Sequence, residues 1–243
     1  MPGMVLRSVN VGQPKEVSYV DRRGREKTTT TGIFKAPVAG PVMPRTLNLD
    51  GDAQADLGGH GGIYKAAYAY TLEKYRYWAD ALARTDFAPA GQFGENFTVE
   101  GMPDDEIGIG DVFRVGAALV EVSQPRVPCF KLGIRMGIPD FQKQFAQSCR
   151  VGFYLRVLED GEVCPGDEFV RVRRPSVPTA TMPAFGRAAF CGTITTCRWT
   201  ATPRFSSAAS AGRWPNWTGC PIDGRPARGP NISAPTGPWT LCS

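Results

Sequence analysis

Ile109-Gly110-Asp111-Val112-Phe113-Arg114-Val115 sets the fold class, because it joins a Gly-Asp turn to a strand with alternating apolar residues. The pattern recurs at residues 165–172, where Gly166-Asp167 precedes a second alternating run. Residues 117–122 and 151–158 also predict short strands, the latter turning at Asp160-Gly161. Short strands separated by such turns are typical of a β-domain.

The N-terminal part of the chain predicts further strands. Alternating valines within residues 5–11 favour a first strand. Residues 16–34 predict a hairpin, because β-branched residues, including four consecutive threonines, surround a turn at 21–24 that ends in Gly24. Residues 46–49 predict a short strand that enters a Gly/Asp-rich loop.

Two helices are predicted. Over residues 71–84 an apolar stripe follows Thr71, a suitable N-cap. Over residues 139–149, Phe141, Phe145 and Cys149 recur every four residues and Pro139 suits the first turn. About eight short strands with only two helices predict a mainly β fold, a closed or nearly closed barrel with helical insertions.

Charge divides the 243-residue chain in two. The formal net charge is +5, but residues 1–173 carry 21 basic and 22 acidic residues. Residues 174–243 carry seven arginines, Asp223 as the only acidic residue, and no lysine. We therefore predict a globular domain over 1–173 and an irregular tail over 174–243. Two origins for the tail stay open: a G+C-rich gene read out of frame, or a genuine disordered extension.

Composition excludes several classes of protein. No run of 18 apolar residues predicts a transmembrane helix, and the N-terminus lacks a signal-peptide pattern, so we expect a cytoplasmic protein. The tail lacks the dense basic runs that track phosphates, so neither nucleic acid nor a membrane is an expected partner. The single histidine, His60, excludes zinc sites with two or three histidines.

Two loops contain reactive side chains. In residues 50–62, four glycines flank His60; such a loop can form an anion-binding nest, or it is a surface loop with an incidental histidine. In residues 123–132, two prolines stiffen the segment before Cys129, and Arg126 and Lys131 favour its thiolate. Cys129 is therefore a candidate for metal ligation or nucleophilic sulfur chemistry, the alternative being a buried structural thiol.

A third segment, Phe93-Gly94-Glu95-Asn96-Phe97, places a carboxylate and an amide at a strand entrance. The two side chains either orient a ligand or serve turn formation. Cys149 and Cys164 have no comparable setting and are interpreted as structural.

Taken together, these segments resemble the molybdenum cofactor sulfurase C-terminal (MOSC) domain family, in particular its stand-alone bacterial YiiM-type members. The resemblance rests on His60-Gly61-Gly62, on Phe93-Gly94-Glu95-Asn96, and on Pro125-Arg126-Val127-Pro128-Cys129. It covers about residues 1–173. After residue 173 the chain departs from the family pattern, which continues into a small helical region.

The resemblance implies a barrel-like fold and a molybdopterin-type molybdenum cofactor. Cys129 is implied as the metal ligand or a sulfur carrier, with His60 and Arg126 lining the pocket. Gly61 and Gly62 are implied as backbone donors near the pterin phosphate. Further residues implied near the cofactor are Lys65, Glu95 and Asn96.

The implied activity is reduction of N-hydroxylated compounds, including hydroxylaminopurines. The sequence shows no ferredoxin-like cysteine set and no flavin motif, so electrons are expected from an external partner protein. The alternative is a sulfur-carrying or cofactor-binding module without reductase activity. Pyridoxal phosphate is not expected, because the aminotransferase-like domain of full cofactor sulfurases is missing.

Overall fold

The computed structural model describes residues 3–58, 61–88, 90–103 and 106–175. His60 and residues 176–243 of the predicted tail therefore lie outside the described residues. The elements are, in chain order, β1 (Val5–Val11), β2 (Lys15–Val20), β3 (Glu26–Thr31), β4 (Ala36–Pro37), the 3-10 helix η1 (Ile63–Lys65), β5 (Ala67–Thr71), α1 (Leu72–Ala81), β6 (Phe97–Glu100), β7 (Val112–Val115), β8 (Ala118–Pro125), α2 (Phe130–Met136), α3 (Phe141–Gln147), β9 (Phe153–Glu159) and β10 (Phe169–Arg173).

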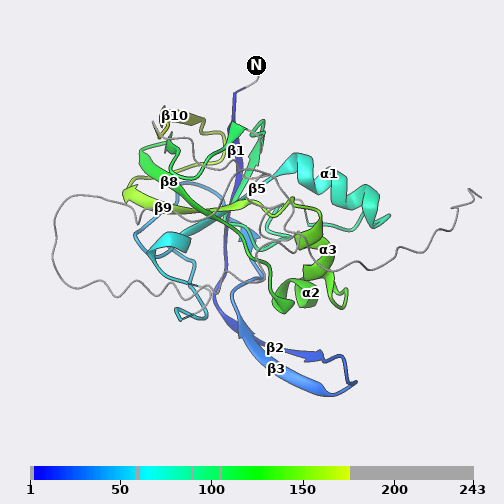
Figure 1. Cartoon of the computed structure of the whole chain (residues 1–243). Coiled ribbons are helices and arrows are strands. Elements are labelled where there is room, and N and C mark those ends of the chain that lie inside the picture. Colours follow the sequence, from blue (N-terminus) through cyan, green and yellow to red (C-terminus); the bar gives the residue numbers. More distant parts are fainter. Residues whose placement is uncertain (1–2, 59–60, 89, 104–105, 176–243) are drawn as a thin grey trace, which may run out of the picture. The chain divides into compact units, whose positions relative to one another are not determined.

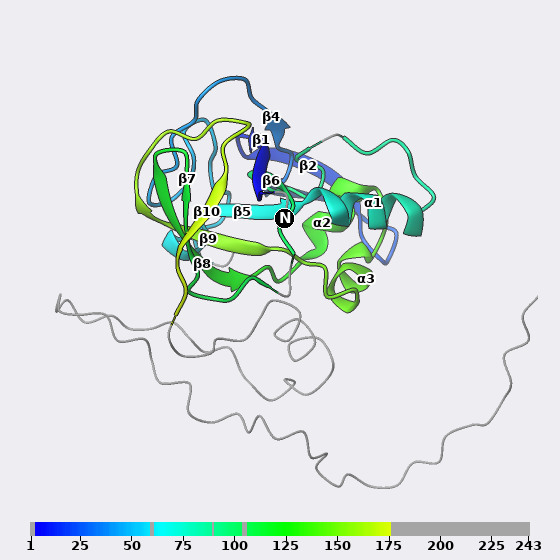
Figure 2. The ribbon, with the colours of Figure 1, turned by 90° about the horizontal axis from the view of Figure 1, so that it is seen from above.

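Eight strands form one curled sheet in the order β10-β7-β8-β9-β5-β6-β1-β4 (Figures 1 and 2). The sheet nearly closes on itself, because Leu6 N–H donates to the Asp167 carbonyl (2.8 Å) and Phe169 N–H to the Met4 carbonyl (2.8 Å). These bonds join the β1 side of the sheet to the chain entering β10. The mainly β, barrel-like fold predicted from the Gly-Asp turns is thus confirmed.

Two apolar clusters stabilise the domain. One fills the inside of the curled sheet and includes Leu6, Phe97 and Phe113. The other is largely aromatic and joins the sheet to the helices, with Trp78 of α1 and Phe145 of α3 at a ring-centroid distance of 5.7 Å. Burial of this area supplies the main driving force for folding and fixes the helices beside the sheet.

The predicted hairpin and the first helix are confirmed as β2–β3 and α1. The second helix is shorter than predicted: α3 begins at Phe141 after Pro139, and Cys149 adopts φ 56°, outside the helix. The strand predicted over 46–49 is wrong, since Arg45 N–H bonds the Asn48 carbonyl (2.9 Å) and makes a local turn.

Helix α2 was not predicted. It has seven residues, too few for a recognisable apolar period, and contains Gly133. Its importance lies in its position, because it begins at the residue after Cys129. Among the described residues, no helix is long and apolar enough to cross a membrane.

Phe145→Ala tests the aromatic cluster. Phe145 is fully buried and packs against Tyr70, Trp78 and Phe93. We expect the free energy of unfolding to fall by about 3–5 kcal/mol in urea titrations, because the substitution leaves a cavity. The control, Val172→Ala at a half-exposed site, should change it by less than about 0.5 kcal/mol. Equal effects of both would show that the cluster does not hold α3.

Candidate functional site

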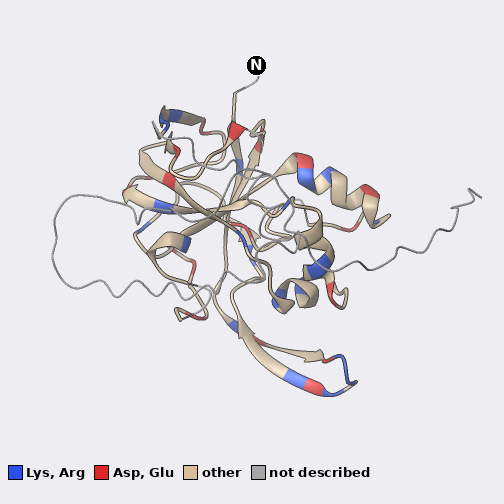
Figure 3. Ribbon diagram, viewed as in Figure 1, with Lys and Arg blue, Asp and Glu red and all other residues tan. Residues whose placement is uncertain are grey.

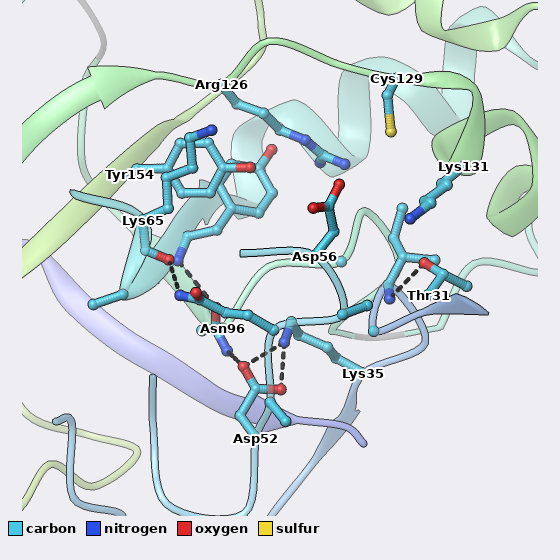
Figure 4. A pocket seen from close by; sticks show the side chains of 18 of the residues that line it. Thr31, Lys35, Asp52, Asp56, Lys65, Asn96, Arg126, Cys129, Lys131 and Tyr154 are labelled. Atoms are coloured by element: carbon cyan, nitrogen blue, oxygen red, sulfur yellow. Dashed lines mark hydrogen bonds and ion pairs between the residues drawn. The ribbon is translucent and has the colours of Figure 1, made fainter. Parts of the chain in front are cut away.

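A cavity that is partly open to solvent lies between the loops at one end of the sheet, the base of the hairpin and the segment leading into α2 (Figure 4). The lining comes from residues 31–33, Lys35, 52–56, Lys65, Ala66, Tyr68, Gly94, Asn96, Arg126, Val127, Cys129, Lys131 and Tyr154.

Arg126 brings a buried charge into the cavity wall. It follows β8, is only 6% exposed, and donates through Nη1 to the Phe93 carbonyl (2.5 Å). Its guanidinium lies 4.5 Å from the centre of the Tyr68 ring. Within the described part of the chain, no carboxylate pairs with it. A buried cation without a neutralising partner is costly, so this wall is prepared for an anion.

Lys35 and Asp52 form a second polar group in the cavity. Both side chains are nearly fully buried, and they form an ion pair. Asp52 also accepts from Gly12 N–H (2.9 Å) and from the Asn96 amide (2.8 Å). Burial lowers the pKa of Lys35, and Asp52 opposes that shift. The predicted residue Asn96 thus lines the cavity, and its amide holds Asp52 in place.

Lys65 and Lys131 complete the cationic lining. Lys65 is half-buried near Tyr154, its amine 5.9 Å from the ring centre. Burial lowers the pKa of Lys65, and Asp56 opposes that shift. In all, four basic side chains face two acidic ones in the cavity lining. The balance favours a ligand with negative charge.

Cys129 lies at the edge of this cavity, as the residue that precedes α2. Its thiol is half-buried, and Figure 4 shows it near Arg126 and Lys131. The described residues contain no group of three His, Cys, Asp or Glu side chains that could hold a metal ion. The described cavity lining contains one thiol, that of Cys129, which is chemically able to serve as a sulfur ligand or as a nucleophile.

Glu95 does not line the cavity. It is fully buried and accepts hydrogen bonds from Tyr75 Oη, Gly91 N–H (2.8 Å), Phe93 N–H (3.1 Å) and Thr98 Oγ1 (2.9 Å). These bonds hold the 91–93 turn. The carbonyls of that turn accept from the arginines at 126 and 135. Glu95 thus acts at the site indirectly, by fixing the turn that orients Arg126.

The predicted glycine donors lie close to the cavity but not in its wall. Gly62 N–H donates to Gln54 Oε1 (2.7 Å), so the protein itself already uses this donor. Gln54 lines the cavity. Lys35 and Tyr154 were not predicted as site residues, because no local motif marks them and the packing of sheet and loops brings them to the cavity. Asp52 and Gln54 lie in the loop 50–62, a candidate anion-binding nest, but neither was assigned a role.

Glu95→Gln tests the positioning of the turn. Burial raises the pKa of Glu95, whereas its hydrogen-bond donors lower it. The NH₂ group of a glutamine side chain cannot accept hydrogen bonds, so some of the donors around Glu95 would lose their acceptor. We therefore expect the free energy of unfolding to fall by about 1–3 kcal/mol. Glu159→Gln, at an exposed carboxylate, is the control. Unchanged stability of Glu95→Gln would mean that the carboxyl is protonated and carries no positioning charge.

Comparison with known proteins agrees with this geometry. Residues 56–170 match the model of the MOSC domain family. YflK, an uncharacterized protein of Bacillus subtilis, is 43% identical over 159 residues, which are 65% of this chain and 69% of that protein. A protein of Gibberella moniliformis named Reductase is 36% identical over 176 residues, which are 72% of this chain but 30% of that longer protein.

A solved structure shows the same fold. The crystal structure of YiiM from Geobacillus stearothermophilus matches with a TM-score of 0.61 and 36% identity, over 77% of this chain and 84% of that one. A sheet curled into a near-barrel, a cysteine at a cationic cavity and these relatives lead to one assignment. The chain belongs to the MOSC domain family.

Proposed function

We propose that this chain binds a molybdopterin-type molybdenum cofactor in the described cavity and reduces N-hydroxylated compounds such as hydroxylaminopurines. The observation that carries the proposal is the pair formed by Cys129 and Arg126. A thiol stands in the same cavity as a buried guanidinium that lacks a carboxylate partner among the described residues.

The residues present fit such a cofactor. A pterin phosphate is an anion, and the cavity lining holds more basic than acidic side chains. A thiolate is a soft ligand that suits a molybdenum centre. In this proposal Cys129 holds the metal, while Arg126 and Lys35 neutralise the anionic part of the cofactor. Asn96 contributes by holding Asp52, the ion-pair partner of Lys35.

The reaction needs two electrons and two protons: the N–O bond of R–NHOH breaks, and R–NH₂ and water form. When bound, the cofactor supplies the two-electron chemistry. The chain supplies proton donors at the cavity wall. Lys65 Nζ is suited to deliver a proton, because burial lowers the pKa of this amine at the cavity wall. His60, outside the described residues, stays a candidate for the same role.

The relatives support this proposal at the level of class. One relative is named Reductase, and a solved relative is a YiiM protein. The electrons come, in this proposal, from an external donor protein, and the setting is the cytoplasm, where removal of N-hydroxylated bases serves detoxification. A small N-hydroxylated molecule is the substrate.

Molybdenum content tests the metal-ligand role. After loading with cofactor, we expect about one molybdenum per wild-type chain by elemental analysis, since Cys129 is the single thiol ligand proposed. Cys129→Ser should lose most of the metal and the hydroxylaminopurine reduction driven by an artificial reductant. Cys164→Ser, a change of the same kind away from the cavity, should lose neither. Full metal content in Cys129→Ser would contradict the role.

The same two proteins distinguish the reductase from the alternative function of a sulfur carrier. In that alternative, Cys129 carries the transferred sulfur as a persulfide. Incubation with a cysteine desulfurase would then add about 32 Da, the mass of one sulfur atom, to the wild type and not to Cys129→Ser. A mass shift without bound molybdenum would favour the sulfur carrier over the reductase.

A further inference from the structure

The β2–β3 hairpin and helices α2 and α3 form one continuous face beside Cys129. Tyr19 of β2 contacts Phe130 of α2 with ring centroids 5.4 Å apart. At the tip, Arg22 Nε donates to Asp140 Oδ1 (2.8 Å) at the start of α3. Figure 1 shows the hairpin extending from the sheet past α2. We call residues 15–31 and 129–147 together the hairpin–helix face.

Contacts at the hairpin base also join the two parts of this face. Lys15 Nζ lies 4.2 Å from the centre of the Phe34 ring, and the Arg135 guanidinium lies 5.1 Å from the same ring. The Phe34 ring thus contacts one cation from β2 and one cation from α2. These two basic side chains therefore lie close to each other in the folded chain.

The hairpin–helix face is basic on a domain that is otherwise acidic. It carries eight basic and four acidic residues, a balance of +4, whereas the rest of residues 1–173 carries 13 basic and 18 acidic residues, a balance of −5. Figure 3 shows blue segments along the hairpin and on α2. Such separation of charge orients an acidic partner toward this face and speeds its association.

Several cations of this face form no ion pair with a described carboxylate. Arg23 and Lys27 are exposed at the hairpin tip, and Lys131 lies beside Cys129. In the described ranges of the chain, none of the three forms an ion pair. Exposed apolar side chains belong to the same face: Val20 of β2 is 65% exposed and Phe130 of α2 is 42% exposed. Apolar anchors within a charged rim are typical of a protein–protein interface.

We propose that the hairpin–helix face is the docking surface for an acidic electron-transfer protein. The proposal rests on the proposed reductase function, because the reaction needs a donor and the face borders the cavity at Cys129. Each substrate takes two electrons, so a one-electron donor must dock twice for every N–O bond that breaks. The four carboxylates of the face and its exposed apolar side chains favour a folded acidic protein over a nucleic acid backbone.

The test compares two double charge reversals in the full chain. Arg23→Glu with Lys27→Glu changes the hairpin tip. Arg45→Glu with Arg114→Glu makes the same change of charge at two exposed residues that pair with carboxylates at the end of β9. Binding to a reduced [2Fe–2S] ferredoxin and to a flavodoxin, both acidic probes, is measured by biolayer interferometry at two salt concentrations.

We expect the hairpin variant to bind each acidic probe about tenfold or more weakly than the wild type, with a smaller dependence on salt, and the control variant to bind as the wild type does. Equal binding by all three proteins overturns the proposal, as does wild type that binds neither probe. Tighter wild-type binding to a short DNA duplex than to either probe also overturns it, in favour of a nucleic-acid surface.

Turnover separates this proposal from the proposed function. Cofactor-loaded hairpin variant should reduce hydroxylaminopurine at the wild-type rate with dithionite-reduced methyl viologen, and more slowly with ferredoxin. Loss of turnover with both reductants would overturn the docking role, because it would show damage to the site itself. Wild type that lacks viologen-driven turnover while it binds the probes would count against the reductase function and leave the docking surface supported.

Discussion

The charge of Arg126 is the constraint on which the cavity depends. A guanidinium stays protonated in proteins, so its burial cannot be relieved by loss of a proton. The domain gives it one carbonyl, that of Phe93, and two aromatic rings, those of Tyr68 and Phe145, in place of a carboxylate. These contacts hold the group in position but leave its charge to be matched by a ligand.

Much of the surrounding structure serves that position. Glu95 organises the 91–93 turn that presents the Phe93 carbonyl to Arg126. The next residue, Asn96, donates to Asp52 and also accepts from Tyr68 N–H (3.0 Å), which fixes the strand beneath the arginine. Two consecutive residues before β6 thus support the cavity in different ways. Glu95 fixes the 91–93 turn that contacts Arg126, and Asn96 holds Asp52, the ion-pair partner of Lys35.

The same arrangement explains what the sequence could predict. Most strands, the hairpin and α1 follow from local patterns, whereas β5, which is buried along its whole length, was not predicted. Cys129 forms a local cluster with Arg126 and Lys131, so this part of the site was accessible. The structure adds the reason for Gly94 in the 93–97 segment: it has φ 78°, and a Cβ there would lie 2.5 Å from Ile33 Cγ1. The ion pair of Lys35 with Asp52 was not accessible, although Asp52 lies in the candidate loop 50–62, because the burial of the two side chains beside each other depends on how separate loops pack.

The sequence also left the role of Glu95 open between ligand contact and turn formation, and only its four donors in the folded chain place it in the turn. Conversely, the basic net charge of the whole chain carries little information about the site. The charge that matters is distributed within residues 1–173, where a basic face and a cationic cavity stand on a domain with a slight acidic excess.

The most direct measurement of the central claim is the unfolding temperature of Arg126→Met with and without a bound anion. If Arg126 is held for a ligand at the expense of stability, the ligand-free variant should be as stable as the wild type or more so. Inorganic phosphate or the cofactor should then stabilise the wild type and not the variant. A variant that is strongly destabilised without ligand, yet gains as much from phosphate and cofactor as the wild type does, would contradict the account.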